Sequence, residues 1–236
     1  MRMKMDFYKF FGYLSWLNYI LWLLELNVVI FAVNLPLLLV LFAMGVRLWS
    51  LPVVFVAGIT IGPSVLAAFD AMPHIEDGVV GFFFRSLAGK WKQCLRIWVP
   101  VWFLAVFLLA DIYILQTYEV MNILKWVMVI ALLGLVSFLL SFFMVWSAWN
   151  QDAKAAAALT LKLSFVKPFR FHMGILILCG TITLLGIKQI YLVLYGVSLG
   201  LFLVYKNFQP VIQYVNERPE NRGFKQGDAN GETESE

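Results

Sequence analysis

Long apolar stretches follow one another along most of this chain, and only short polar segments separate them. Hydrophobic residues make up 62% of the 236 residues and charged residues only 14%, whereas soluble globular proteins contain roughly 45–50% apolar and about 25% charged residues. A water-soluble core of this size could not bury so much apolar surface. Several stretches also reach the roughly 20 residues that a helix needs to cross a bilayer. The sequence therefore predicts an all-α, polytopic membrane protein.

We expect six membrane spans, which cover residues 22–44, 51–71, 97–118, 123–149, 171–186 and 190–205. The last two are short, and only Lys188 and Gln189 separate them, so one long broken helix is the alternative to the tight hairpin that we expect there. Basic residues near span ends gather on the cytoplasmic side of membrane proteins. With a cytoplasmic N-terminus, all of the 18 Lys and Arg residues except Arg47, Lys125 and Lys188 lie on that side, and so does the C-terminus.

Two domains of unequal size are expected. Residues 1–208 form the transmembrane helical domain. After residue 208 the composition becomes polar and rich in glycine and glutamate, so residues 209–236 are expected to be a disordered cytoplasmic tail. The net charge of +4 reflects membrane orientation, and we expect no nucleic-acid partner.

Two amphipathic segments are expected to lie in the inner headgroup layer as elbow helices. In the first, apolar side chains recur every three or four residues and a polar face follows one position later; these are Phe84, Leu87, Trp91 and Leu95, then Arg85, Gly89, Lys92 and Arg96. The second elbow links the fourth and fifth spans and carries Lys162, Lys167 and Arg170. The first is either an interfacial element alone or also a docking surface, with Phe84, Arg85, Trp91 and Lys92 as candidate contacts.

The second span contains an unusual group of residues, "GITIGPS", at positions 58–64. Gly58 and Gly62 form a GxxxG pair, which lets a neighbouring helix approach closely. Pro63 removes a backbone donor, so the helix should kink or restart there. The hydroxyl of Thr60 can satisfy a carbonyl that the kink frees. We therefore expect a kinked and tightly packed span.

Four motifs occur in an order that resembles the YesL-like family of bacterial integral membrane proteins, a domain of unknown function. They are "LN" from Leu26, "NLP" from Asn34, "TIGPSVLAAF" from Thr60 and "FFRSLAGKWKQ" from Phe83. The resemblance implies a bacterial cell-membrane location. It gives as structural candidates Asn27, Pro36, Thr60, Gly62, Pro63, Phe84, Arg85 and Lys92. In many members "LP" runs almost directly into "TIGP", whereas residues 37–59 intervene here, so the outer hairpin is expected to be longer.

Members of that family are often encoded beside carbohydrate ABC importers, so the resemblance implies an accessory role in carbohydrate uptake, with sugar importer permease subunits as partners. Such a subunit would contact its partner through the glycine face and the basic elbows. Assembly with further copies of the same chain stays open.

A self-contained small-solute transporter is the alternative, because polar residues inside membrane spans are costly and often functional. Its candidate polar path comprises Glu25, Asn27, Asn34 and Asp111. The opposing interpretation is that each of these lies near an interface or pairs with a neighbouring helix. A non-transporting scaffold or sensor is the third hypothesis. No nucleotide-binding or nucleophile motif occurs, and His74 with Glu76 and Asp77 is a weak metal signal. We therefore expect no enzymatic activity, no cofactor and no metal.

Overall fold

The computed structural model describes residues 2–117, 122–149, 152–186 and 195–216, and every regular element in these ranges is helical. The α-helices are α1 (Arg2–Val33), α2 (Leu35–Met44), α3 (Leu51–Ala57), α4 (Ile61–Ala71), α5 (Val79–Thr117), α6 (Asn122–Trp149), α7 (Ala153–Val166), α8 (Pro168–Gly186) and α10 (Val197–Asn216). Short 3-10 turns lie beside them, at η1 (Leu48–Ser50), η2 (Gly58–Thr60) and η3 (Met72–Asp77). An all-helical chain is what the apolar pattern predicts.

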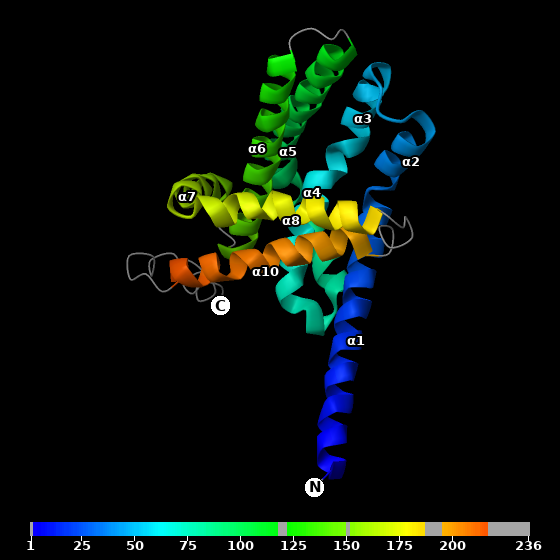
Figure 1. The fold of residues 1–236 in the computed structure, drawn as a ribbon, viewed down its shortest axis with the longest axis vertical. Helices are drawn as coiled ribbons and strands as arrows, with labels where there is room; N and C mark the ends of the chain where they lie inside the picture. Colours follow the sequence, from blue (N-terminus) through cyan, green and yellow to red (C-terminus); the bar gives the residue numbers. More distant parts are fainter. Residues whose placement is uncertain (1, 118–121, 150–151, 187–194, 217–236) are drawn as a thin grey trace, which may run out of the picture.

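The helices run in two main directions (Figure 1). α5 and α6 stand side by side as a hairpin, and α3 descends beside them into α4. α1 projects away from the opposite end of the molecule. α8 and α10 lie side by side across the middle, roughly perpendicular to α5 and α6, with α7 near one end of α8. The last three helices therefore do not extend the α5–α6 hairpin into a parallel bundle.

Three helical stretches in the described part of the chain are long and apolar enough to cross a membrane, namely Leu48–His74, Val79–Gln116 and Ile123–Trp149. They correspond to the second, third and fourth expected spans. Two further pairs of helices reach this length only together, because each pair is bent, by 68° between α1 and α2 and by 102° between α7 and α8. Counting each bent pair as one span gives up to five. Six spans are therefore not confirmed in the described residues, and residues 190–194 of the sixth expected span lie outside them.

The first expected span is broken at Asn34. α1 ends at Val33, and α2 starts at Leu35 with Pro36 in its first turn. Proline is well tolerated there because the first helical positions need no internal hydrogen-bond donor. Proline also crowds the preceding turn, so a continuous helix over 22–44 is replaced by two helices.

The first elbow is not a separate helix, and this prediction was wrong. α5 runs without a break for 39 residues, about 58 Å at 1.5 Å per residue. Its glycines, Gly81 and Gly89, lie within the helix, as does Pro100. None of the three ends the helix, so the basic segment continues into the apolar one.

The face of α5 that packs in the core is a different one from the apolar face that was expected to lie in the headgroup layer. Between residues 79 and 98 the buried side chains are Val79, Phe83, Cys94 and Trp98, whereas Phe84 is exposed. Three phenylalanines in a row, at 82–84, let several registers satisfy the same periodic pattern. The choice of Phe83 depends on the neighbouring helices, which sequence periodicity does not reveal.

The second elbow is confirmed as a helix of its own, α7, which ends just before Pro168. α8 and α10 then pack antiparallel: the Asn207 side-chain amide donates to the Arg170 carbonyl at 2.9 Å, and Gly200 lies against Leu178. This arrangement favours two helices over one long broken helix. The residues that connect them, 187–194, lie outside the described ranges.

α10 extends beyond the expected domain boundary. The helix continues to Asn216, and its last turns bury Val211 and Val215. Residues 209–216, the first part of the expected tail, therefore belong to a packed helix. Residues 217–236, the remainder of the expected tail, lie outside the described ranges.

The core lies where α1, α4, α5, α6, α8 and α10 meet. Its largest fully buried side chains include Phe69, Phe83, Phe143, Trp146 and Phe208. Away from this region, large apolar side chains are exposed, for example Phe42 on α2, Ile123 on α6 and Phe165 on α7. Exposed apolar surface of this extent is typical of membrane or protein contact surfaces.

Candidate functional site

The glycine pair of the second span packs against two tryptophans of α5. A Cβ atom added at Gly58 would lie 2.4 Å from the Trp102 ring, and one added at Gly62 would lie 2.3 Å from the Trp98 ring. No side chain larger than hydrogen fits at either position without moving an indole. The close approach predicted for the GxxxG pair is therefore present. The helix that approaches these glycines is α5 of the same chain, and docking of another protein on this face stays a prediction.

The same tryptophans supply hydrogen bonds where the helix is interrupted. Between α3 and α4 the backbone tightens into η2, and α4 restarts at Ile61, so the predicted kink is confirmed. The Trp98 indole donates to the Gly58 carbonyl at 3.2 Å, and the Trp102 indole donates to the Phe55 carbonyl at 2.9 Å. The two rings stack with centroids 5.4 Å apart. The two indoles therefore bond to backbone carbonyls near the interruption, which is the role that was predicted for the Thr60 hydroxyl.

Thr60 instead bonds to the break between α1 and α2. Its hydroxyl donates to Asn34 Oδ1 at 2.9 Å. The Asn34 amide nitrogen donates to Ser64 Oγ at 2.8 Å and to the Ile30 carbonyl at 2.9 Å, and Ser64 donates to the Ile61 carbonyl at 2.8 Å. We call Asn34, Thr60 and Ser64 the amide cluster. It joins the interruption after α1 to the interruption before α4, and its groups satisfy one another in the protein interior.

The residues of the predicted polar path are not brought together. Asn27 is buried, and its Oδ1 accepts a hydrogen bond at 3.1 Å from the backbone N–H of Ser198, at the start of α10. Asn34 belongs to the amide cluster. Glu25 is exposed and Asp111 is half-buried toward the far end of α5. Within the described ranges, no hydrogen bond or ion pair joins either carboxylate to another residue.

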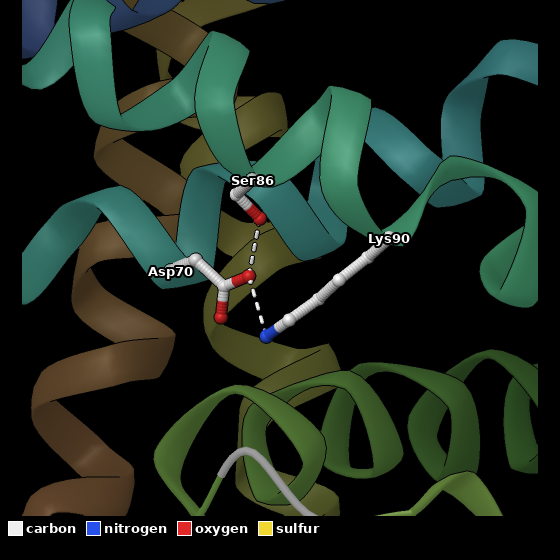
Figure 2. A network of polar contacts seen from close by, with 3 residues as sticks. All are labelled: Asp70, Ser86 and Lys90. Carbon is white, nitrogen blue, oxygen red and sulfur yellow. Dashed lines mark hydrogen bonds and ion pairs between the residues drawn. The ribbon is translucent and has the colours of Figure 1, made fainter. Parts of the chain in front are cut away.

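A charged cluster that sequence reasoning missed lies at the junction of α4 and α5. Ser86 and Lys90 lie one helical turn apart on α5, so both side chains reach the same face. Figure 2 shows that both point at one oxygen of Asp70 from α4. Lys90 Nζ lies 2.9 Å from Asp70 Oδ2, and the Ser86 hydroxyl donates to that oxygen. The Asp70 side chain is 12% exposed and that of Lys90 23% exposed.

This charged cluster, defined as Asp70, Ser86 and Lys90, lines an open pocket of about 520 Å³. The pocket is formed by α4, η3, α5 and the end of α6, and its other lining residues are Pro73, His74, Phe82, Arg85, Gly89, Ser147 and Ala148. The His74 ring stacks on Phe82 at 4.1 Å between centroids, and the Arg85 guanidinium lies 5.7 Å from the centroid of the same phenylalanine. Two cations, hydroxyl groups and a flat aromatic wall therefore surround one carboxylate.

The predicted docking residues of α5 fall into different places. Arg85 lines the pocket. Phe84 and Lys92 are exposed, and Trp91 is half-buried. Arg85, Lys92 and Arg96 are separated by seven and four residues, so they form one exposed basic stripe along the helix.

One sequence signal could have identified the charged cluster. Asp70 is an acidic residue within the expected second span, 51–71, where a charge is costly. Lys90 was counted only for membrane orientation. The pairing of the two depends on how α4 packs against α5, which no spacing in the sequence reveals.

No group of three or more His, Cys, Asp or Glu residues in the described part of the chain could hold a metal ion. Asp70 has cations as neighbours, and these compete with any bound metal. The charged and hydroxyl groups that line the pocket suit recognition of charge and hydrogen bonding.

Comparison with other proteins adds no evidence on the family of this chain. No family model matches the chain, and no match was found among curated proteins or among solved structures. The likeness to YesL-like proteins therefore stays a prediction from the four motifs.

Proposed function

We propose that this chain is a multi-pass protein of the bacterial cell membrane that crosses it four times, through α1–α2, α3–α4, α5 and α6. α7, α8 and α10 then lie along the inner face. Three of these crossings rest on long apolar helices and the fourth on a bent pair. The transverse direction of α8 and α10 in Figure 1 supports the inner-face layer.

The distribution of basic residues supports this topology. An even number of crossings keeps both termini on the cytoplasmic side. All of the 18 Lys and Arg residues except Arg47 and Lys125 then fall on that side, which is a stronger asymmetry than six spans produce. Two reporter enzymes fused after Asn216 test the cytoplasmic position of the C-terminus. A reporter that works only in the cytoplasm should be active, and one that works only outside the membrane should be inactive.

For a protein with this membrane topology, we propose the role of an accessory subunit rather than that of a solute transporter. One observation carries this choice: the polar side chains between the helices bond to one another, while a basic stripe of α5 is exposed. Asn27 and Asn34 each engage a neighbouring helix. Phe84 and Lys92, in contrast, present an aromatic and a charged group to the outside. The four residues of the predicted path do not converge, which weakens the transporter hypothesis.

The carbohydrate uptake system is the partner we propose, and this part rests on the resemblance to YesL-like proteins alone. Permease subunits of such importers are membrane proteins with cytoplasmic loops, which an exposed basic stripe at the inner face could reach. A scaffold or sensor would use the same surface with a different partner.

A partner search tests the proposal. The C-terminally tagged protein is extracted from native membranes in mild detergent, and co-purifying chains are identified by mass spectrometry. We expect permease subunits in comparable amounts, and their loss in Lys92→Glu. Lys125→Glu is the matched control, because Lys125 lies at the opposite end of the α5–α6 hairpin. Recovery of the protein alone, as monomer or homodimer, would exclude the accessory role.

A further inference from the structure

We propose that the pocket beside Asp70, Ser86 and Lys90 binds the phosphate group of an anionic lipid headgroup. The inference rests on the proposed membrane placement, and it does not depend on the identity of the protein partner. Three features of the pocket lead to it: its charge balance, its shape and its place at the ends of the crossing helices.

The charge balance of the pocket favours a singly charged anion. Asp70 offsets the charge of Lys90, with which it is paired at 2.9 Å. Arg85 also lines the pocket, and it leaves one positive charge there. A phosphodiester carries a single negative charge. The exposed guanidinium of Arg85 offers several donors in a plane that suits phosphate oxygens.

Lys90 can take part without leaving Asp70. An ammonium group has three N–H donors, and one of these is directed at Asp70 Oδ2. The others remain available to an oxygen that enters the pocket. Ser147, from α6, adds a hydroxyl on a different wall. A phosphate between Arg85 and Lys90 would thus replace water at groups that are already held in place.

The pocket also has room for more than the phosphate. Its volume of about 520 Å³ falls within the roughly 300–1,000 Å³ of small-molecule sites. The stacked rings of His74 and Phe82 form a flat wall. The carbon skeleton of a glycerol group could pack against this wall while the phosphate faces the cations.

The location distinguishes a lipid from a soluble phosphate as the expected source. α4 ends, α5 begins and α6 ends at this pocket. All three long apolar stretches therefore have one end at the pocket, and these three ends lie on the same side of the molecule. In the proposed topology that is the cytoplasmic headgroup level, where anionic lipids concentrate and basic pockets between helices bind their headgroups.

Asp70 limits the affinity of this site, because its carboxylate competes with a phosphate for Lys90 and repels it. Replacing it by asparagine keeps an oxygen that accepts hydrogen bonds from Ser86 and Lys90 but removes the charge. Asp70→Asn should therefore strengthen binding, while Arg85→Gln and Lys90→Met should weaken it. Opposite effects from neighbouring residues are hard to explain by general attraction to the membrane.

The experiment measures lipid retention by native mass spectrometry of the purified, detergent-solubilised full chain. Dioleoylphosphatidylglycerol is added in one arm, dioleoylphosphatidylcholine in a second and soluble glycerol phosphate in a third. We expect preferential binding of phosphatidylglycerol, weakened about fivefold by Arg85→Gln, since one basic residue contributes about 1 kcal/mol near an anionic surface. Arg96→Gln is the control, because Arg96 lies on the same exposed stripe of α5 but outside the pocket.

The outcomes separate the alternatives. Equal losses in Arg85→Gln and Arg96→Gln, or weaker binding in Asp70→Asn, would overturn the proposal. Binding of glycerol phosphate with the expected order of variants, but no preference between the lipids, would keep the phosphate site and overturn the lipid as its source. Arg85 is exposed, so its variant should fold even if Lys90→Met does not. A normal lipid result with no co-purifying permease would contradict only the accessory role.

Discussion

The amide cluster and the charged cluster both lie between helices, yet they are built differently. In the amide cluster, Asn34 uses its oxygen and its nitrogen on two different residues of the kinked span, Thr60 and Ser64. In the charged cluster, two donors converge on a single oxygen of Asp70, beside an open pocket. The first arrangement is neutral, and its Asn34 and Ser64 side chains are buried, which suits a joint between helices. The second keeps charge at a surface that a ligand can reach.

The polar groups of the amide cluster hold helices together, whereas those of the charged cluster are placed where they can bind a ligand. Neutral amides and hydroxyls satisfy one another at little cost. A charged pair is expensive to bury, because both groups lose their hydration. Variants that disturb each cluster, and the packing that supports it, can test the contrast.

The largest effect is expected from Gly62→Leu, which acts on the packing beside the amide cluster. The new side chain would collide with the Trp98 ring, and displacing the indole would also remove its bond to Gly58. Overpacking of this kind costs about 3 kcal/mol of unfolding free energy. Thermal unfolding in detergent, followed by circular dichroism, measures the loss.

Gly134→Leu is the matched control for this change. Gly134 lies on α6, and an added Cβ there meets no atom within 4 Å. The variant should therefore unfold near the parent temperature. A Gly62→Leu protein as stable as the control would mean that α4 and α5 are not packed as described.

A smaller loss is expected from Asn34→Leu. The change leaves Thr60 and Ser64 without the partner that both share. Thr60 loses its acceptor and Ser64 loses one of its two hydrogen bonds, and together these losses cost about 2 kcal/mol. The same unfolding measurement applies, with Asn18→Leu as control, since Asn18 is an exposed asparagine of α1. If the two variants were equally stable, the amide cluster would not be a structural joint.

Parts of the fold with a purely local cause were predictable from the sequence. Pro63 and its neighbouring glycines predict the interruption between α3 and α4, because proline cannot donate to the preceding turn. Pro168 similarly separates α7 from α8. Apolar length predicts the long helices of the second, third and fourth spans. Each of these depends only on residues close together in the chain.

The features that were missed depend on contacts between distant residues. The 19 residues of α8 are apolar enough to look like a span, but hydropathy carries no information about direction. Its course across the molecule follows from packing against α10, for example between Arg170 and Asn207. The partner of Asp70 is likewise 20 residues away, on another helix. Periodicity describes one helix at a time and cannot assign such pairs.

The smallest effect on stability is expected in the charged cluster, from Lys90→Met. The change leaves the carboxylate of Asp70 without its cation, but the carboxylate keeps the Ser86 hydroxyl and partial exposure to water. We expect a loss of about 1 kcal/mol, because the open pocket lets water reach the pair, and ion pairs in contact with water are weak. The double variant Asp70→Asn with Lys90→Met should be more stable than Lys90→Met alone, since no unpaired charge remains.

The salt dependence of the two stability losses distinguishes the two clusters most directly. Mobile ions screen charges that lie near the surface, with a Debye length of roughly 10 Å at 0.1 M and about 3 Å at 1 M. The cost of Lys90→Met should therefore shrink when unfolding is measured in 1 M rather than 0.1 M sodium chloride. The cost of Asn34→Leu should stay the same, because no member of that cluster is charged. If both costs changed in parallel with salt, the distinction between a neutral joint and an open charged site would fail. A cost of Lys90→Met that resisted salt would mean that the ion pair is shielded from water, and that the pocket is closed to ligands from solution.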